Sequence, residues 1–304
     1  MAGVTSTSTA LDALIGRVQQ GEALGDEDLA LILDSHDLAA IGMVSDEVRR
    51  QLHGTETTFV RVFEAHVDAP PAALPGAVAA GEFRIVGTPE SIDAACRTVR
   101  DMRALAGGSP LFGFALHEIE ALGGDPHEAF GRLREAGLDG IAEVVVDVTS
   151  SADGIHAARN AGLLALRATV QSAWRDRLAL LTQARDVLSQ AGGFRAFAPL
   201  PRQLSGATPT TGFDDVKAVA LARLLLRDVP SIQVDWPLYG PKLAQVGLIV
   251  GADDVDGVAA VDGGVLGARR SPLEEIRGNI RAAGLTAVER NGRFERTSGD
   301  GARG

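Results

Sequence analysis

The chain of 304 residues contains a single cysteine, Cys96. One cysteine excludes a disulfide within the chain, and it excludes any site that needs several thiolates from one chain, such as a cysteine-held iron–sulfur cluster. Cys96 lies in the segment SIDAACRTVRDM, among apolar residues at helical spacing. We therefore expect its thiol to be buried as a small hydrophobic group rather than exposed as a nucleophile.

Basic charge and long apolar runs are also scarce. The formal net charge is −11 and no basic run is visible, so we expect no nucleic-acid partner. No stretch of about 20 apolar residues occurs, which argues against a membrane span. The opening residues MAGVTSTSTALDALIG lack the basic and apolar regions of a signal peptide. These features predict a cytoplasmic protein with no membrane partner.

Several motifs that carry chemistry are missing as well. The sequence has no H-x-H on its first apolar run, no H-E-x-x-H, no G-x-S-x-G and no P-loop framework. The segment DDVDG lacks the later acidic ligand of a calcium-binding EF-hand loop. We therefore predict no metal ligands and no cofactor-binding residues, and no catalytic residues can be assigned by motif.

From about residue 57, short apolar runs alternate with amphipathic helical patterns. Strand and helix in turn indicate an α/β fold with a parallel sheet, and eight such units predict a (β/α)₈ TIM-like barrel that need not be regular. A doubly wound open sheet is the alternative, which the lack of G-x-G-x-x-G after the first run disfavours. The predicted strands cover residues 58–65, 82–87, 111–116, 141–148, 163–170, 194–200, 231–237 and 246–252.

The two ends of the chain differ from this pattern. Residues 10–56 repeat apolar positions every three or four residues and predict an N-terminal helical extension, followed by the TIM-like barrel domain at 57–290. Residues 1–9 are small and polar, and residues 291–304 are polar and rich in glycine. Both ends are therefore predicted to be disordered.

Acidic side chains follow several of the predicted strands. In a TIM barrel the functional residues lie at the C-terminal ends of the strands. On that basis the candidate pocket at the barrel mouth contains Glu118, Asp147, Asp235, Trp236, Asp254 and Asp256. Asp254 and Asp256 belong to the segment GLIVGADDVDG, interpreted as the last strand and its exit turn. Turn formation and helix capping are the alternative role of these two acids.

One long segment resembles a known family. Residues 209–257, with TGFDD-K, ARL-L and GPKLAQV-L--GA-D-DG, and the preceding GGF-AF-PL at 192–200, are similar to the C-terminal part of the radical SAM enzymes of the futalosine route to menaquinone. Aminofutalosine synthase, cyclic dehypoxanthine futalosine synthase and the related deazaflavin-cofactor synthase subunit are the members it resembles. The resemblance extends over roughly residues 10–295 and implies a radical SAM-like TIM barrel.

The strand-end loops depart from this family. Its members carry C-x-x-x-C-x-x-C after the first strand, and these cysteines hold a [4Fe–4S] cluster that binds S-adenosylmethionine. The corresponding segment is HVDAPPAALPG, with no cysteine. The departure predicts no [4Fe–4S] cluster, no radical SAM activity and no other cofactor, and it puts S-adenosylmethionine binding in doubt.

Two classes of function are consistent with a kept scaffold and altered loops. The first is a non-catalytic partner or regulator, bound to a radical SAM enzyme of menaquinone biosynthesis or to a small-molecule ligand. The second is a repurposed barrel enzyme that uses strand-end carboxylates on a small polar substrate. A ligand-binding module without catalysis is the third alternative.

Overall fold

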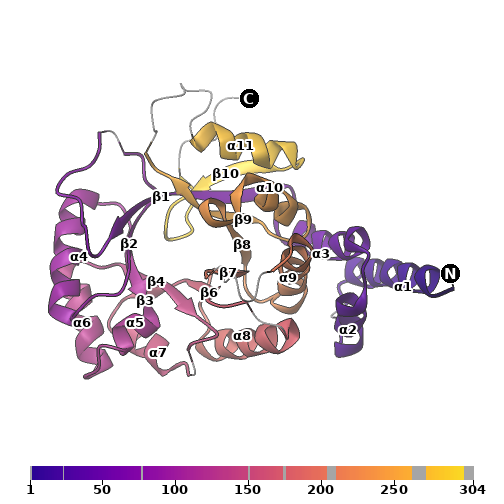
Figure 1. The fold of residues 1–304 in the computed structure, drawn as a ribbon, viewed down its shortest axis with the longest axis horizontal. Helices are drawn as coiled ribbons and strands as arrows, with labels where there is room; N and C mark the ends of the chain where they lie inside the picture. Colours follow the sequence, from indigo (N-terminus) through magenta and orange to yellow (C-terminus); the bar gives the residue numbers. More distant parts are fainter. Residues whose placement is uncertain are drawn as a thin grey trace.

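A computed structural model describes residues 2–22, 24–76, 78–149, 151–173, 176–203, 210–261 and 272–297. Its centre is a parallel β-barrel surrounded by helices (Figure 1). The strands are β1 (Glu56–His66), β2 (Glu82–Val86), β3 (Leu111–Ala115), β4 (Gly140–Val145), β5 (Leu164–Ala165), β6 (Arg167–Val170), β7 (Ala196–Pro201), β8 (Ser231–Asp235), β9 (Asp254–Ala259) and β10 (Thr286–Arg290).

The barrel closes because β9 pairs with β1. β5 and β6 follow one another along β4 and share one position in the barrel, which gives eight positions in the order of the chain. β10 is an addition that lies against the first half of β1, from Glu56 to Val60, whereas β2 lies against the second half, from Val62 to His66. The predicted TIM-like barrel is thus confirmed, with one extra strand at its N-terminal end.

Helices follow most of the strands, as a (β/α)₈ fold requires. They are α4 (Ile92–Ala106), α5 (Leu116–Glu120), α6 (Pro126–Ala136), α7 (Asp153–Asn160), α8 (Arg177–Ala191), α9 (Gly212–Leu225), α10 (Trp236–Ile249) and α11 (Pro272–Ala282). In α4, the Ser91 side chain caps the first turn, and Cys96, Val99 and Met102 are buried against the barrel. Between β1 and β2, the described residues form turns and no helix.

The region predicted as a helical extension contains three helices: α1 (Ala2–Gln19), α2 (Asp26–Asp34) and α3 (Leu38–His53). Residues 2–9, predicted to be disordered, form the first part of α1. The extension packs on the outside of α9 (Figure 1). α9 is therefore covered by the barrel on one side and by α3 on the other, which explains why all of its residues from Asp215 to Leu224 are buried. Among the described residues, no helix combines the length and apolarity needed to cross a membrane.

The predicted eighth strand at 246–252 is wrong. Its apolar run forms the end of α10 and the turn after it, with Gly247, Leu248 and Val250 buried. The eighth barrel strand is β9, which begins at Asp254. A short apolar run is compatible with a buried helix as well as a strand, and here the helix forms. Consequently Asp254 and Asp256 do not lie in an exit turn at the mouth, because they stand in the first half of the strand.

The predicted C-terminal disorder is wrong for residues 291–297. After β10 the chain makes a compact turn, in which the Gly292 amide donates to the Gly81 carbonyl at 2.9 Å. The Asn291 side chain accepts from the amides of Arg293 and Glu295, and the Thr297 amide donates to Glu289. These bonds fix a polar, glycine-containing segment that composition alone classes as disordered. The rest of the predicted tail lies outside the described residues.

Candidate functional site

The interior of the barrel carries charged side chains rather than an apolar filling. Successive side chains of a strand point to opposite faces, so every second residue faces the interior. In β9, Val255 belongs to the apolar core while its neighbours Asp254 and Asp256 hydrogen-bond to side chains of other strands. The inward residues of this kind are Thr58, Glu82, Arg84, Arg167, Gln233, Asp254, Asp256 and Arg290.

Asp256 is the centre of this network. The Arg84 guanidinium donates two hydrogen bonds to its carboxylate, at 2.8 and 2.9 Å, and Arg167 donates a third. The Asp256 side chain is fully buried, and burial alone raises the pKa of a carboxyl group. The guanidinium groups of Arg167 and Arg84 outweigh burial and hold the pKa of Asp256 well below its usual range. Asp256 is therefore a permanent anion at neutral pH.

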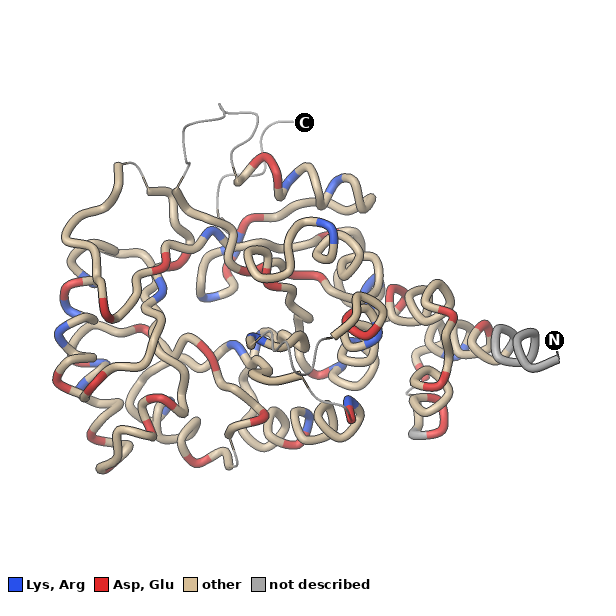
Figure 2. Tube along the Cα trace, in the orientation of Figure 1, with Lys and Arg blue, Asp and Glu red and all other residues tan. Residues whose placement is uncertain are grey.

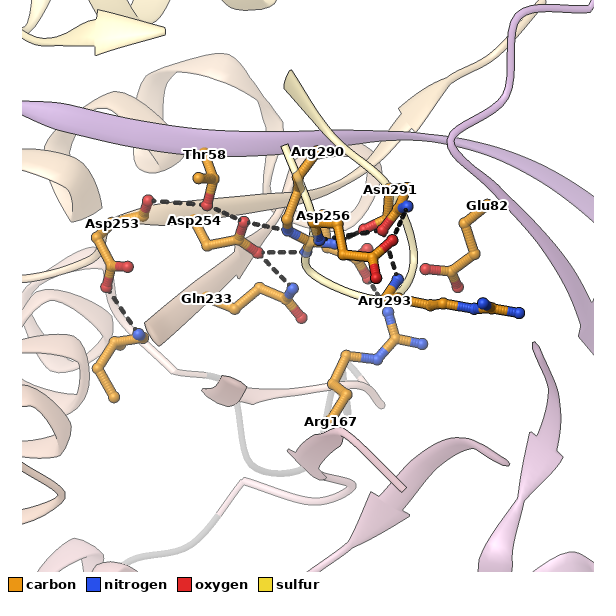
Figure 3. Close-up of polar contacts among 12 residues, drawn as sticks. Thr58, Glu82, Arg167, Gln233, Asp253, Asp254, Asp256, Arg290, Asn291 and Arg293 are labelled. Carbon is orange, nitrogen blue, oxygen red and sulfur yellow. Dashed lines mark hydrogen bonds and ion pairs between the residues drawn. The ribbon is translucent and has the colours of Figure 1, made fainter. Parts of the chain in front are cut away.

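Asp254 begins β9, two residues before Asp256, and forms a second centre, whose contacts are drawn in Figure 3. Arg290, from β10, donates to its two oxygens at 2.6 and 2.7 Å, and Gln233 donates at 2.6 Å. Thr58 hydrogen-bonds to the same carboxylate. The Phe294 ring packs on the Arg290 guanidinium, with 3.8 Å between the ring centroid and the guanidinium carbon Cζ. This centre joins β1, β8, β9 and β10 and has a structural role.

Arg202, just after β7, extends the network toward the barrel mouth. It hydrogen-bonds to Asp235 at the end of β8, and its guanidinium lies 3.4 Å from Glu143 and 3.7 Å from Asp256. The Nε and Nη2 atoms of Arg202 are buried without a hydrogen-bond partner in the described part of the chain. Glu143 and Asp235 are partly exposed, so this end of the network can hydrogen-bond to a polar molecule from the mouth.

The structure brings only some of the predicted site residues together. Asp235 and Asp256 meet through Arg202, and Trp236 begins α10 directly after Asp235. Asp254 lies deeper, with Arg290. The carboxylate of Glu118 accepts from Thr88 and from the Ala115 amide, which caps α5. Asp147 accepts from the amides of Gln171 and Ser172 and so fixes the segment after β6.

Several residues of the network were not predicted from the sequence, among them the buried charged residues Glu82, Arg84, Arg167 and Arg290. A signal for them exists in the strand pattern. Arg84 and Arg167 interrupt the apolar runs EFRIVG and LLALRATV at positions that face inward. A charged residue in the middle of a buried strand is costly unless it is paired, so each such residue predicts a buried partner of opposite charge.

The described residues do not fit an iron–sulfur cluster. Such a cluster needs three or four cysteine thiolates, and the segment between β1 and β2 has none. Cys96, the single cysteine, lies buried in α4, where burial raises the pKa of its thiol. Among the described residues, no group of three or more His, Cys, Asp and Glu side chains is arranged to hold a metal ion.

The sequence matches one family model, the CofH/MqnC C-terminal region, over residues 192–299. This range contains β7, β8, β9 and β10, and therefore Arg202, Asp235, Asp254, Asp256 and Arg290. The other part of the network, on β1, β2, β4 and β6, lies outside it.

Curated relatives agree with this match. Cyclic dehypoxanthine futalosine synthase of Streptomyces coelicolor is 31% identical over 190 residues, which cover 60% of this chain and 46% of that protein. Aminodeoxyfutalosine synthase of Thermus thermophilus is 32% identical over 171 residues, or 47% of this chain and 46% of that protein. The chain thus spans about half the length of these relatives. The matches confirm the resemblance to radical SAM enzymes of menaquinone biosynthesis.

Solved structures agree on the fold. Methylornithine synthase superimposes with a TM-score of 0.63 at 15% sequence identity, over 90% of this chain and 97% of that protein. The maturase HydG of the [FeFe]-hydrogenase from Carboxydothermus hydrogenoformans gives 0.63 at 11% identity, over 94% and 81%. At such low identity these likenesses concern the barrel alone.

Proposed function

Because this chain belongs, through residues 192–299, to the CofH/MqnC group of the radical SAM menaquinone-type proteins, we propose that it is a barrel of this family that acts without radical chemistry. In this proposal it is a non-catalytic partner or regulator of a radical SAM enzyme of menaquinone biosynthesis, and it is cytoplasmic. The observation that carries the proposal is the segment between β1 and β2, which contains no cysteine in a chain with only one.

The position of Cys96 supports this proposal. Its side chain is 1% exposed and packs among the apolar residues of α4, outside the barrel interior. A single thiolate in that place cannot replace three cluster ligands. The scaffold around the barrel interior is nevertheless intact, with each inward charge paired. A kept scaffold with lost chemistry is compatible with a function in binding, because function depends on the site and not on the fold.

Iron and sulfide analysis of anaerobically purified and reconstituted protein tests the loss of the cluster. We expect less iron than one atom per chain and no visible absorption band of an iron–sulfur cluster. About four irons and four sulfides per chain would contradict the proposal. The matched control is aminodeoxyfutalosine synthase of Thermus thermophilus, reconstituted in parallel, because a failed reconstitution would leave that enzyme empty too.

Purification of the tagged protein from its native cells tests the partner role. We expect co-purification of a radical SAM enzyme and a change in the activity of that enzyme when the protein is added back. If no such enzyme co-purifies from cells that contain the pathway, the partner role is contradicted. The result of the iron and sulfide analysis is not affected by this outcome.

A second candidate function is ligand binding at the barrel mouth. The observation that favours it is the group formed by Glu143, Arg202 and Asp235, in which buried guanidinium donors lack hydrogen bonds. This group suits a small polar molecule with both acceptor atoms and hydroxyl or amino donors. Acid–base catalysis through Asp256 finds less support, since its lowered pKa leaves this carboxylate ionised and weakly basic at neutral pH.

A thermal-shift panel of futalosine-pathway metabolites and S-adenosylmethionine tests this second candidate. A ligand that binds the folded state raises the melting temperature. The matched variant is Glu143→Gln, which keeps the shape of the side chain and removes its charge. A shift that is equal in the wild type and in Glu143→Gln would place the ligand elsewhere.

A further inference from the structure

A cavity lies at the opposite end of the barrel from the mouth. Its volume is about 560 Å³, within the range of small-molecule sites. The lining comes from residues that precede or begin barrel strands, together with the end of α6 and the turn after β10. These residues are Arg134, Asp139, Gly162, Leu164, Leu166, Arg195, Arg293, Phe294 and Glu295.

The charges around this cavity are unusual for an acidic protein. Three arginines and two carboxylates line it, although the chain as a whole has a net charge of −11. Asp139 is already bound, because its oxygens accept from Arg103 at 2.5 Å, from the Leu111 amide at 2.8 Å and from Arg293 at 3.1 Å. The Glu295 carboxylate accepts from Asn291 at 2.8 Å. Both carboxylates therefore have their own donors within the protein.

Arg195 is the cation without a partner. It is exposed, and within the described part of the chain its guanidinium makes no hydrogen bond, ion pair or ring contact. It stands just before β7, held by its own backbone, whose amide donates to Leu166 at 2.7 Å and whose carbonyl accepts from Ser231 at 3.0 Å. A rigid backbone thus presents an uncommitted guanidinium to the cavity.

The floor of the cavity is apolar. Leu164, Leu166 and Phe294 contribute partly exposed side chains. Phe294 adopts a φ of 62°, a left-handed conformation that is unfavourable for a bulky residue. Such strain persists only where the surroundings fix it, and it is frequent at ligand sites. Here the strained turn keeps the Phe294 ring between Arg290 and the cavity.

We propose that this cavity binds a small anion with an apolar body, a carboxylate or a phosphate monoester, whose charge pairs with Arg195 and Arg293 while its body packs on Leu164, Leu166 and Phe294. Guanidinium groups bind both anions through paired N–H donors. The site is independent of the function proposed above, because it lies at the other end of the barrel. An anion bound in the cavity contacts Phe294. The Phe294 ring packs on Arg290, and Arg290 hydrogen-bonds to Asp254.

The test is a saturation-transfer NMR titration of the full chain with three probes: 4-phenylbutyrate, phenethyl phosphate and the neutral 4-phenylbutyramide. We expect at least one anionic probe to bind and the amide to bind at least about tenfold more weakly, since a charge-assisted hydrogen bond is lost. The two anionic probes distinguish a carboxylate site from a phosphate site. Equal binding of the amide, or binding of none of the three, would overturn the proposal.

Two variants test whether the anionic probe binds in this cavity. Arg195→Ala is expected to weaken the anionic probe about tenfold without lowering the melting temperature, because among the described residues its guanidinium has no hydrogen bond, ion pair or ring contact to lose. Arg100→Ala is the matched control: it removes the same charge from an exposed position on α4 and should leave binding unchanged. Unchanged binding in Arg195→Ala, or an equal loss in Arg100→Ala, would rule out the cavity as the anion site.

Discussion

Arg84 and Asp256, 172 positions apart in the sequence, form a two-point ion pair across the barrel interior, with N–O distances of 2.8 and 2.9 Å. Arg84 comes from β2 and Asp256 from β9, and β1 stands between these two strands in the barrel. The Arg84 side chain is 4% exposed and that of Asp256 is fully buried. The pair therefore links the first and last parts of the barrel through a contact that water does not screen.

Removing one partner of this pair should be strongly destabilising. Arg84→Met leaves the Asp256 charge buried with fewer donors, and we expect a loss of about 3–5 kcal/mol in the free energy of unfolding. Denaturant titration measures the change. The double variant Arg84→Met with Asp256→Leu should lose less than the sum of the two single variants, since no charge is then left alone. Additive losses would show that the pair is not coupled.

The same centre predicts an acid dependence of stability. The pKa of Asp256 is lowered in the folded protein, so the folded state releases this proton more readily than the unfolded state does. Its contribution is fully present above the unfolded pKa, about 3.9, and is lost as the pH falls toward the folded value. Stability measured against pH should therefore fall less steeply below about pH 4 for Asp256→Asn than for the wild type. Identical slopes would contradict this assignment.

The strained turn at Phe294 predicts that glycine is more stable than alanine at this position, which reverses their usual order. In most turns at negative φ, alanine is at least as stable as glycine, but at a φ of 62° only glycine is unstrained. Phe294→Gly and Phe294→Ala both lose the ring that packs on Arg290. We expect the glycine variant to be more stable than the alanine variant by about 1 kcal/mol. An alanine variant of equal or greater stability would show that the turn relaxes.

The hydrogen bond of Lys217 leads to a prediction about how firmly the helical extension is attached to α9 and the barrel. Its ammonium group donates to the Leu33 carbonyl at the end of α2, at 2.5 Å, and its side chain is 8% exposed. Lys217→Met keeps the apolar stem but leaves the carbonyl unpaired, which should cost about 1–3 kcal/mol. Hydrogen exchange in α2 should become faster than in the barrel strands. The control is Lys242→Met at an exposed position of α10, which should change neither quantity.

Cys96 should be unreactive in the folded protein. Its side chain is 1% exposed, and burial raises the pKa of the thiol, so little thiolate forms and reagents cannot reach it. We expect an aromatic disulfide reagent to label the native protein at least about 100-fold more slowly than the unfolded protein. Rapid labelling of the native state would show that α4 opens readily.

The sequence predicts the scaffold better than the interior. The runs TFVRVFEA and EFRIVG form strands, as predicted from the alternation of short apolar runs with helical patterns, and this pattern can be read locally in the sequence. The segment GLIVGA fits a helix and a strand equally well, and only the packing of α10 against the barrel decides between them. The role of Asp256 depends on Arg84 and Arg167, whose positions relative to it follow from barrel closure and not from spacing along the chain.

The C-terminal turn shows the same difficulty at a shorter range. NGRFERT is polar and contains glycine, so its composition predicts disorder. Its order depends on Gly81 and Glu289, which accept from the amides of Gly292 and Thr297. Composition describes a segment alone and cannot include such partners.

The arrangement of β1 has a consequence for synthesis on the ribosome. One edge of this strand is divided between β2 and β10, so its first residues, from Glu56 to Val60, have no strand on that side until residues 286–290 have been made. The other edge of β1 has no partner strand until β9 has been made. Contacts this distant in sequence form late and slowly. The emerging chain must therefore keep the first half of this strand without a strand partner until β9 and β10 have been made, although β2 can already pair with the second half.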